Sequence, residues 1–199
     1  MATVSLALSA LFGVLAVGVR MALHVRRTGR TPLRSGSGVG GVGAIAGLSA
    51  AFVAGPVAEL SFGLHRWTHS AALAAAGVVL SVVGLIGVVW SQASMGESLR
   101  IGVDPSERTA LVSGGPFRFV RNPIYSAMLV YVTGVALMVP NAASVVALVL
   151  LAIAIDLHVR LVEEPYLVAT HGESYSRYAA RVGRFVPGVG RRLPQRSEP

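Results

Sequence analysis

Residues 124–157 read IYSAMLVYVTGVALMVPNAASVVALVLLAIAIDL, two apolar runs separated only by Pro140 and Asn141. Each run is almost free of charge, as expected of a helix whose surroundings are lipid. A proline followed by an asparagine favours a turn. The stretch therefore predicts a tight antiparallel helical hairpin, with both open ends on the same side of a membrane.

Three further apolar runs precede this hairpin, at residues 2–19, about 39–58 and about 71–93. The composition agrees with a membrane protein, since 53% of the 199 residues are hydrophobic, 13% are charged and the mean hydropathy is +0.66. A soluble fold of this length could not bury so much apolar surface. We expect an all-α integral membrane helical bundle with about five transmembrane helices, forming a single domain.

The arginines predict the orientation of the bundle. The chain has no lysine, and its net charge of +8 therefore comes from arginine. All arginines except Arg66 follow the first, third or fifth apolar run, which five spans place on one side. By the positive-inside rule that side is the cytoplasm, so the N-terminus lies outside and the C-terminus inside. A nucleic-acid binder would gather its arginines on a soluble face, so we expect no nucleic-acid partner.

Absent residue types narrow the chemistry. Without cysteine, the chain has no disulfide, no thiolate metal site and no cysteine nucleophile. Glu59, His65 and His69 lack the spacing of a metal-ligand set, so we predict no metal. The missing lysine beside abundant Ala, Val, Gly and Arg is typical of a GC-rich bacterial genome, which would place the chain in the inner (plasma) membrane.

Charged residues follow the fifth apolar run. Asp156 lies near the cytoplasmic end of this run, either as a functional carboxylate or as a partner of a neighbouring arginine. On a continuing helix, Arg160 is one turn from both Glu163 and Glu164, so ion pairs can form. Two interpretations of the adjacent carboxylates stay open: a solvated helix end, or a cradle for a cationic group such as an ammonium or sulfonium.

The segment before the fourth apolar run predicts a complementary site. Pro123 suits the first turn of a helix, and Asn122 is a favourable N-cap. The free N–H groups there, together with Arg118 and Arg121, would attract an anion such as a carboxylate. The two hairpin ends together would suit a zwitterionic amino-acid group.

A resemblance to a known family rests on an ordered set of motifs. Gly-Pro-Phe-Arg-Phe-Val-Arg-Asn-Pro-Ile-Tyr at 115–125 is followed, after the hairpin, by Glu163, Glu164, Leu167, Gly172, Tyr175, Tyr178, Arg184 and Pro187. Over about residues 90–190 this resembles the isoprenylcysteine carboxyl methyltransferases and the related phospholipid methyltransferases. The chain departs from the family pattern at Asn122, where many members have histidine, and at Ala127 and His171.

The resemblance implies a membrane enzyme that uses S-adenosyl-L-methionine and takes a lipophilic substrate from the bilayer, with membrane lipids as partners. The apolar runs predict three N-terminal transmembrane helices in residues 1–95. The resemblance implies a cofactor-binding part in 96–199, containing the hairpin 123–160 and a cytoplasmic C-terminal segment. The implied catalytic residues are Glu163, Glu164 and Arg160. The implied cofactor-binding residues are Arg121, Asn122, Pro123, Tyr125, Glu163, Glu164, Tyr175, Tyr178, Arg184, Gly96 and Arg100.

Two other functions stay open from the sequence. A membrane reductase of the steroid-reductase type would hold a nicotinamide cofactor in a similar cavity. A small transporter or structural membrane subunit would bind neither cofactor. The sequence does not specify the acceptor or the oligomeric state.

Overall fold

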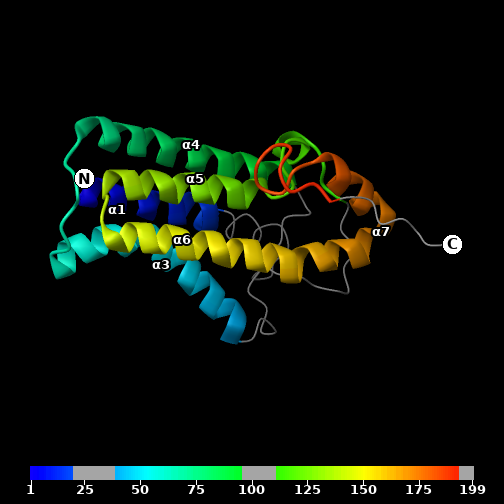
Figure 1. Ribbon diagram of the computed structural model, residues 1–199, viewed down its shortest axis with the longest axis horizontal. Helices are drawn as coiled ribbons and strands as arrows, with labels where there is room; N and C mark the ends of the chain where they lie inside the picture. Colours follow the sequence, from blue (N-terminus) through cyan, green and yellow to red (C-terminus); the bar gives the residue numbers. More distant parts are fainter. Residues whose placement is uncertain (20–38, 96–110, 193–199) are drawn as a thin grey trace. The chain divides into compact units, whose positions relative to one another are not determined.

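The computed structural model describes residues 1–19, 39–95 and 111–192 (Figure 1). Within these ranges the regular structure is helical, apart from one isolated parallel bridge between Val120 and Gly183. The expected all-α class is therefore confirmed for the described residues. In chain order the elements are α1 (Ala2–Phe12), the π-helix η1 (Gly13–Val19), α3 (Val39–Phe62), α4 (Ala71–Met95), the 3-10 helix η3 (Gly115–Arg118), α5 (Pro123–Met138), α6 (Ala142–His158), the π-helix η4 (Val159–Glu163) and α7 (Glu164–Arg181).

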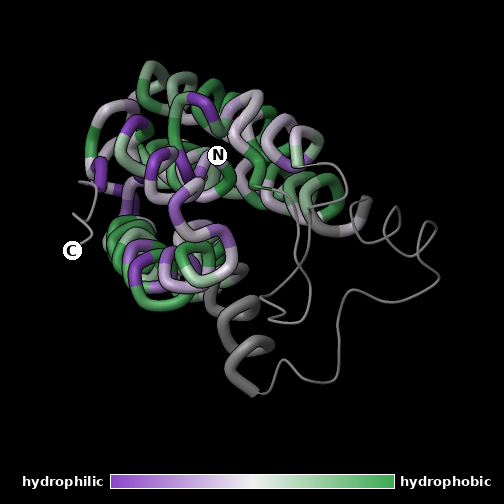
Figure 2. Tube along the Cα trace, turned by 90° about the vertical axis from the view of Figure 1, so that its right-hand side faces the viewer, coloured by the Kyte–Doolittle hydropathy of each residue, from purple (hydrophilic) through white to green (hydrophobic). Residues whose placement is uncertain are grey.

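Two helical segments, Ala71–Met95 and Ala142–Arg181, are long and apolar enough to cross a membrane. Only 33% and 22% of their most apolar stretches is buried, so most of that apolar surface faces outward. Apolar colouring follows much of the helical tube in Figure 2. A soluble protein would turn such a surface toward its core, so a membrane bundle accounts for it better. Ala2–Ala16, Ala50–Phe62 and Pro123–Met138 are shorter apolar helices, and the number of five spans stays a prediction.

The chain divides into two compact units. The apolar unit comprises Met1–Val89 and Ala127–Ile153, and the polar unit comprises Trp90–Ser126 and Ala154–Pro199. Helices α4, α5 and α6 each continue from one unit into the other. The division into residues 1–95 and 96–199 stays a prediction.

Three aromatic rings join α1, α3 and α5 in the apolar unit. The ring centroids of Phe12 and Tyr131 are 4.6 Å apart, and the Phe52 ring lies 4.6 Å from Phe12 and 5.3 Å from Tyr131. Ser9 Oγ donates a hydrogen bond to the carbonyl oxygen of Phe52 at 2.9 Å. Aromatic contacts and a hydroxyl that satisfies a buried carbonyl can both stabilise helix packing in lipid.

Helices α4 and α5 approach each other through glycines. A Cβ added to Gly134 would lie 2.5 Å from the carbonyl oxygen of Gly77, and one added to Gly84 would lie 2.6 Å from the amide nitrogen of Tyr131. Small residues allow the two backbones to touch. In lipid, where the hydrophobic effect does not bring helices together, the dispersion energy of such contacts stabilises the helix pair.

The turn between α5 and α6 is short, as the sequence predicts. Asn141 Oδ1 accepts a hydrogen bond from the Ser144 amide at 2.9 Å, which caps α6. Asn141 Nδ2 donates to the carbonyl oxygen of Gly55 at 3.0 Å, which ties the turn to α3. Asn141 is completely buried, so both ends of its side-chain amide are used inside the protein.

Candidate functional site

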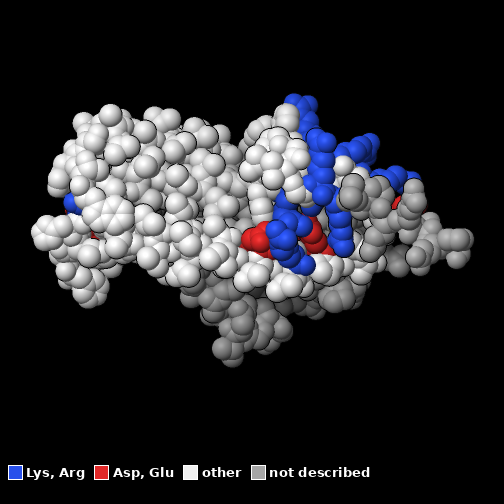
Figure 3. Space-filling view, in the orientation of Figure 1, with Lys and Arg blue, Asp and Glu red and all other residues white. Residues whose placement is uncertain are grey.

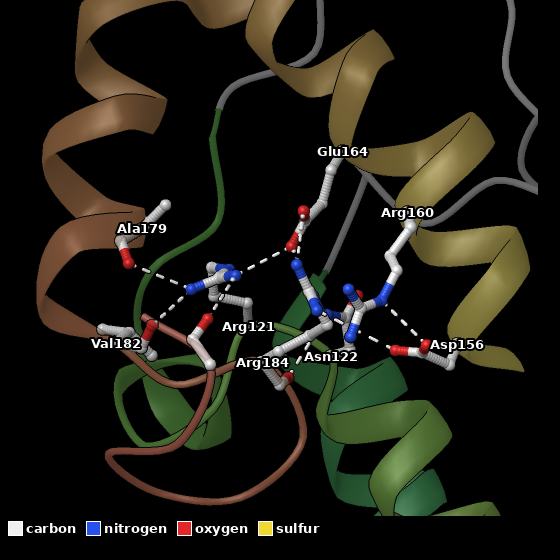
Figure 4. Close-up of polar contacts among 9 residues, drawn as sticks. Arg121, Asn122, Asp156, Arg160, Glu164, Ala179, Val182 and Arg184 are labelled. Atoms are coloured by element: carbon white, nitrogen blue, oxygen red, sulfur yellow. Dashed lines mark hydrogen bonds and ion pairs between the residues drawn. The ribbon is translucent and has the colours of Figure 1, made fainter. Parts of the chain in front are cut away.

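Arg121 is buried, and its guanidinium points toward Glu164, Ala179 and Val182 (Figure 4). Its Nη2 atom lies 2.7 Å from Glu164 Oε1 and also donates to the carbonyl oxygen of Gly190 at 3.1 Å. Its Nη1 atom donates to the carbonyl oxygens of Ala179 and Val182. Glu164 and three backbone carbonyls therefore occupy most of this guanidinium, which acts as an internal partner.

Glu164 accepts hydrogen bonds from two arginines. Arg184 Nε donates to Oε1 at 2.8 Å and Arg184 Nη2 donates to Oε2 at 2.9 Å, a bidentate pair. Burial by itself would raise the pKa of Glu164, but hydrogen bonds from Arg184 and Arg121 outweigh it and hold this pKa below the usual value. Glu164 is thus ionised at neutral pH. We call Arg121, Glu164 and Arg184 the arginine–glutamate clamp.

Backbone contacts attach residues 182–192 to the start of α5. The Arg121 amide donates to the carbonyl oxygen of Gly183 at 2.8 Å, next to the bridge between Val120 and Gly183. The amide and the side-chain Nδ2 of Asn122 both donate to the carbonyl oxygen of Arg184, at 3.1 and 3.2 Å. Helix α5 begins at Pro123 as expected. Asn122 therefore uses its side chain to hold the C-terminal loop.

Arg160 corrects one expectation from the sequence. Its Nε atom lies 2.7 Å from Asp156 Oδ2, and its guanidinium makes no ion pair with Glu163 or Glu164 among the described residues. The chain from Val159 to Glu163 is π-helical, and this wider turn changes which side chains share a face. Asp156 also lies 3.8 Å from Arg184, so it extends the clamp. In Figure 3 most of the visible charged side chains gather in the right half of the view, a small patch of charge lies at the left edge, and much of the visible face is uncharged.

Tyr175 and Tyr178 lie inside the polar unit. Their ring centroids are 6.2 Å apart, and they pack with Ala179 as a small core. The Tyr178 hydroxyl donates to the carbonyl oxygen of Phe117 at 2.6 Å. Burial, with a contribution from the charge of Glu164, raises the pKa of Tyr175 to about 12, and burial also raises the pKa of Tyr178. Both phenols are therefore neutral at physiological pH and hold α7 against η3.

Glu163 is the carboxylate that the clamp leaves over. Its side chain is half-buried, and its Oε2 atom is buried without a hydrogen-bond partner among the described residues. Burial raises the pKa of Glu163 and the charge of Glu164 adds to the rise, although a hydrogen bond from Tyr125 opposes it. The Tyr125 ring meets the His158 ring edge-on at 6.2 Å. A buried acceptor without a donor is costly, so this oxygen is suited to an added cation or hydrogen-bond donor.

Most of the expected site residues meet in the polar unit. Arg121, Asn122, Glu164 and Arg184 are directly connected, whereas Tyr125 and Glu163 form a separate pair. Gly96 and Arg100 lie outside the described residues. Sequence reasoning did not identify the acceptors supplied by the carbonyls of Ala179, Val182 and Gly190, because every residue type carries such a group.

Comparison with known protein families shows to which family the chain belongs. The sequence model described as phospholipid methyltransferase matches residues 72–174, about half of the chain. The chain therefore belongs to the phospholipid methyltransferase family, which confirms the resemblance seen in its motifs. No curated protein matches it. The match runs from α4 to the kink of α7 at Gly172 and includes Arg121, Glu163 and Glu164.

Proposed function

We propose that the protein is an integral membrane methyltransferase that uses S-adenosyl-L-methionine and methylates a lipophilic small molecule or lipid. Two observations support this. One is the family match, and the other, which carries the argument for the site, is the buried Oε2 atom of Glu163, which has no hydrogen-bond partner among the described residues. The cofactor has a positively charged sulfonium and an ammonium group. A carboxylate that has no ion-pair partner among the described residues can accept a hydrogen bond from the ammonium or attract the sulfonium by its charge.

The two adjacent glutamates would have different tasks. Glu164 is neutralised within the clamp, so it holds α7, residues 182–192 and the start of α5 together. Glu163 remains for the ligand, with Tyr125 orienting its carboxylate. Bound S-adenosyl-L-methionine would supply an already activated methyl group, so the protein mainly has to hold the reactants in line. The same carboxylate is the nearest candidate to accept a proton if the acceptor is an amine or hydroxyl.

A lipophilic acceptor fits the surface beside Glu163. Leu157, Leu161 and Val162 are exposed by 50%, 71% and 46%. They precede Glu163 on α6 and η4, so an apolar molecule in the bilayer could contact them while its polar group reaches the carboxylate. This arrangement favours lateral access from the membrane.

The proposed topology has five spans, with the N-terminus outside and the C-terminus in the cytoplasm. The support is the gathering of arginines after the first, third and fifth apolar runs. The polar unit, with Glu163 and the clamp, would then face the cytoplasm from the inner membrane. Reporters fused after Pro140 and after Arg192 should lie on opposite sides.

Calorimetric binding tests the cofactor assignment. Purified protein in detergent should bind S-adenosyl-L-methionine and its product S-adenosylhomocysteine saturably and should not bind a nicotinamide dinucleotide. Glu163→Gln should weaken the affinity for S-adenosyl-L-methionine, which carries both cationic groups, roughly 10-fold or more, because the contact with a charged carboxylate is lost. Glu173→Gln is the matched control, since Glu173 forms an exposed pair with Arg177 on α7. Equal affinity in both variants would refute the role of Glu163.

The pH dependence sharpens the same test. Because the pKa of Glu163 is raised, the protonated fraction of its carboxyl group at a given acidic pH is larger than that of an ordinary glutamate. A cationic ligand prefers the ionised form, so the affinity should rise with pH through this pKa and then level off. Glu163→Gln should remove that rise, whereas Glu173→Gln should keep it.

A further inference from the structure

The two tryptophans of the chain lie on its surface. Trp67 is 66% exposed and Trp90 is 52% exposed, although large aromatic side chains normally contribute to cores. Trp67 precedes α4, and Trp90 lies near its C-terminal end. The family and the proposed methyl transfer do not account for either side chain.

An ordered loop holds Trp67 outward. The Trp67 amide donates to the carbonyl oxygen of Pro140 at 2.8 Å, which fixes the loop to the turn between α5 and α6. The preceding Arg66 forms an ion pair with Glu59 at 3.1 Å, and both side chains are mostly buried. Phe62, at the end of α3, is 81% exposed. Trp67 is therefore exposed on a loop that these contacts hold in place, close in sequence to the exposed ring of Phe62.

Trp90 continues an apolar stripe along α4. Val79, Val83 and Ile86 are exposed by 60%, 54% and 60%, and their spacing of four and three residues places them on one helical face. Trp90 follows Ile86 by four residues on the same face. Since α4 is long and apolar enough to cross a membrane, lipid would cover this stripe.

The length of α4 matches the distance between two membrane interfaces. From Ala71 to Trp90, a helix rising about 1.5 Å per residue covers about 28 Å. The hydrocarbon core of a bilayer is about 30 Å thick. A tryptophan ring is mainly apolar but has one N–H donor, so it prefers the boundary between acyl chains and headgroups.

We propose that Trp67 and Trp90 lie in the two opposite headgroup regions of the bilayer and set the depth of α4. The partner of both rings is the lipid interface itself. This inference concerns the membrane position of one helix and does not depend on the cofactor or the acceptor.

Depth-dependent quenching in reconstituted vesicles tests the proposal. Trp90→Phe leaves Trp67 as the sole tryptophan, and Trp67→Phe leaves Trp90; excitation at the red edge of the absorption band selects tryptophan over the five tyrosines. Each variant is placed in phosphatidylcholine vesicles that contain phosphatidylcholine brominated either near the headgroup or near the chain end. Both variants should lose more fluorescence to the shallow bromines. Stronger loss to the deep bromines in either variant, or no loss in either, would overturn the proposal.

A midpoint reporter separates a spanning helix from one that lies along the surface. Val83→Trp, combined with Trp67→Phe and Trp90→Phe, places one ring on the same exposed face about halfway along α4. It should lose more fluorescence to the deep bromines. Equal depth at all three positions would contradict the proposal. Trp90→Tyr keeps an amphipathic ring and serves in place of Trp90→Phe if that variant folds poorly.

Discussion

The apolar unit and the polar unit bury different kinds of polar group. The fully buried polar side chains described in the apolar unit are neutral: Ser5, Ser9, Ser81, Asn141 and Ser144. Its ion pair between Glu59 and Arg66 is only partly buried. The polar unit buries the charged side chains of Arg121 and Glu164. Where lipid is the proposed solvent, backbone contact and neutral hydrogen bonds connect the helices. In the polar unit, Glu164 and its two arginines form a buried ionic cluster that connects α7 and the loops. Removing one partner leaves a buried charge uncompensated, which destabilises the fold.

Glu164→Gln should produce the largest loss of stability. Removing the negative charge leaves the buried Arg121 without its counter-ion, and the free energy of unfolding should fall by about 3 kcal/mol. Denaturant titration of the protein in detergent measures this change. A loss as small as that of Glu173→Gln would show that the clamp does not support the polar unit.

Acid should reproduce this loss in the wild type. The folded pKa of Glu164 is lowered, so its stabilisation is present above the unfolded value of about 4.3 and disappears as the pH falls through the folded pKa. Melting temperatures measured across this acidic range should fall more steeply for the wild type than for Glu164→Gln.

Gly134→Ala tests the apolar unit and should have an intermediate effect. The new methyl group would lie 2.5 Å from the carbonyl oxygen of Gly77, so α4 and α5 would have to separate. Overpacking of this kind costs about 2 kcal/mol. Gly13→Ala is the matched control, because a Cβ there meets nothing within 4 Å. Equal melting temperatures for the two variants would contradict the close packing of these helices.

Arg160→Gln should have the smallest effect. The Arg160 and Asp156 side chains are 55% and 38% exposed, so solvent screens their ion pair. We expect a loss of about 0.5 kcal/mol or less in the free energy of unfolding, with S-adenosylhomocysteine binding unchanged. A large loss of affinity would instead return Arg160 to the site.

Much of the helical framework could be predicted from the sequence. The apolar runs, the start of α5 at Pro123 and the turn at Asn141 follow from hydropathy and local turn chemistry. The π-helical turns could not be predicted, because they depend on how neighbouring helices pack. The spacing of a regular helix allows Arg160 to pair with the glutamates, whereas in the structure it contacts Asp156, the partner that the sequence leaves as an alternative.

The site was predictable in composition but not in its pairing. The motifs identified Arg121, Glu163, Glu164 and Arg184 as belonging together. They could not tell which glutamate the arginines neutralise, since adjacent carboxylates have the same chemistry and differ only in direction. Three-dimensional contacts assign Glu164 to the clamp and leave Glu163 with a buried oxygen.

The clamp also has a consequence for biosynthesis. Arg121 is translated 58 residues before Ala179, whose carbonyl it binds, and Arg184 follows later still. While the ribosome is still delivering the final helix, Arg121 and Glu164 have not received all their partners. The clamp can therefore close only after α1 to α7 have been synthesised, and a nascent chain that stops before Arg184 would leave Glu164 without one of its two arginines.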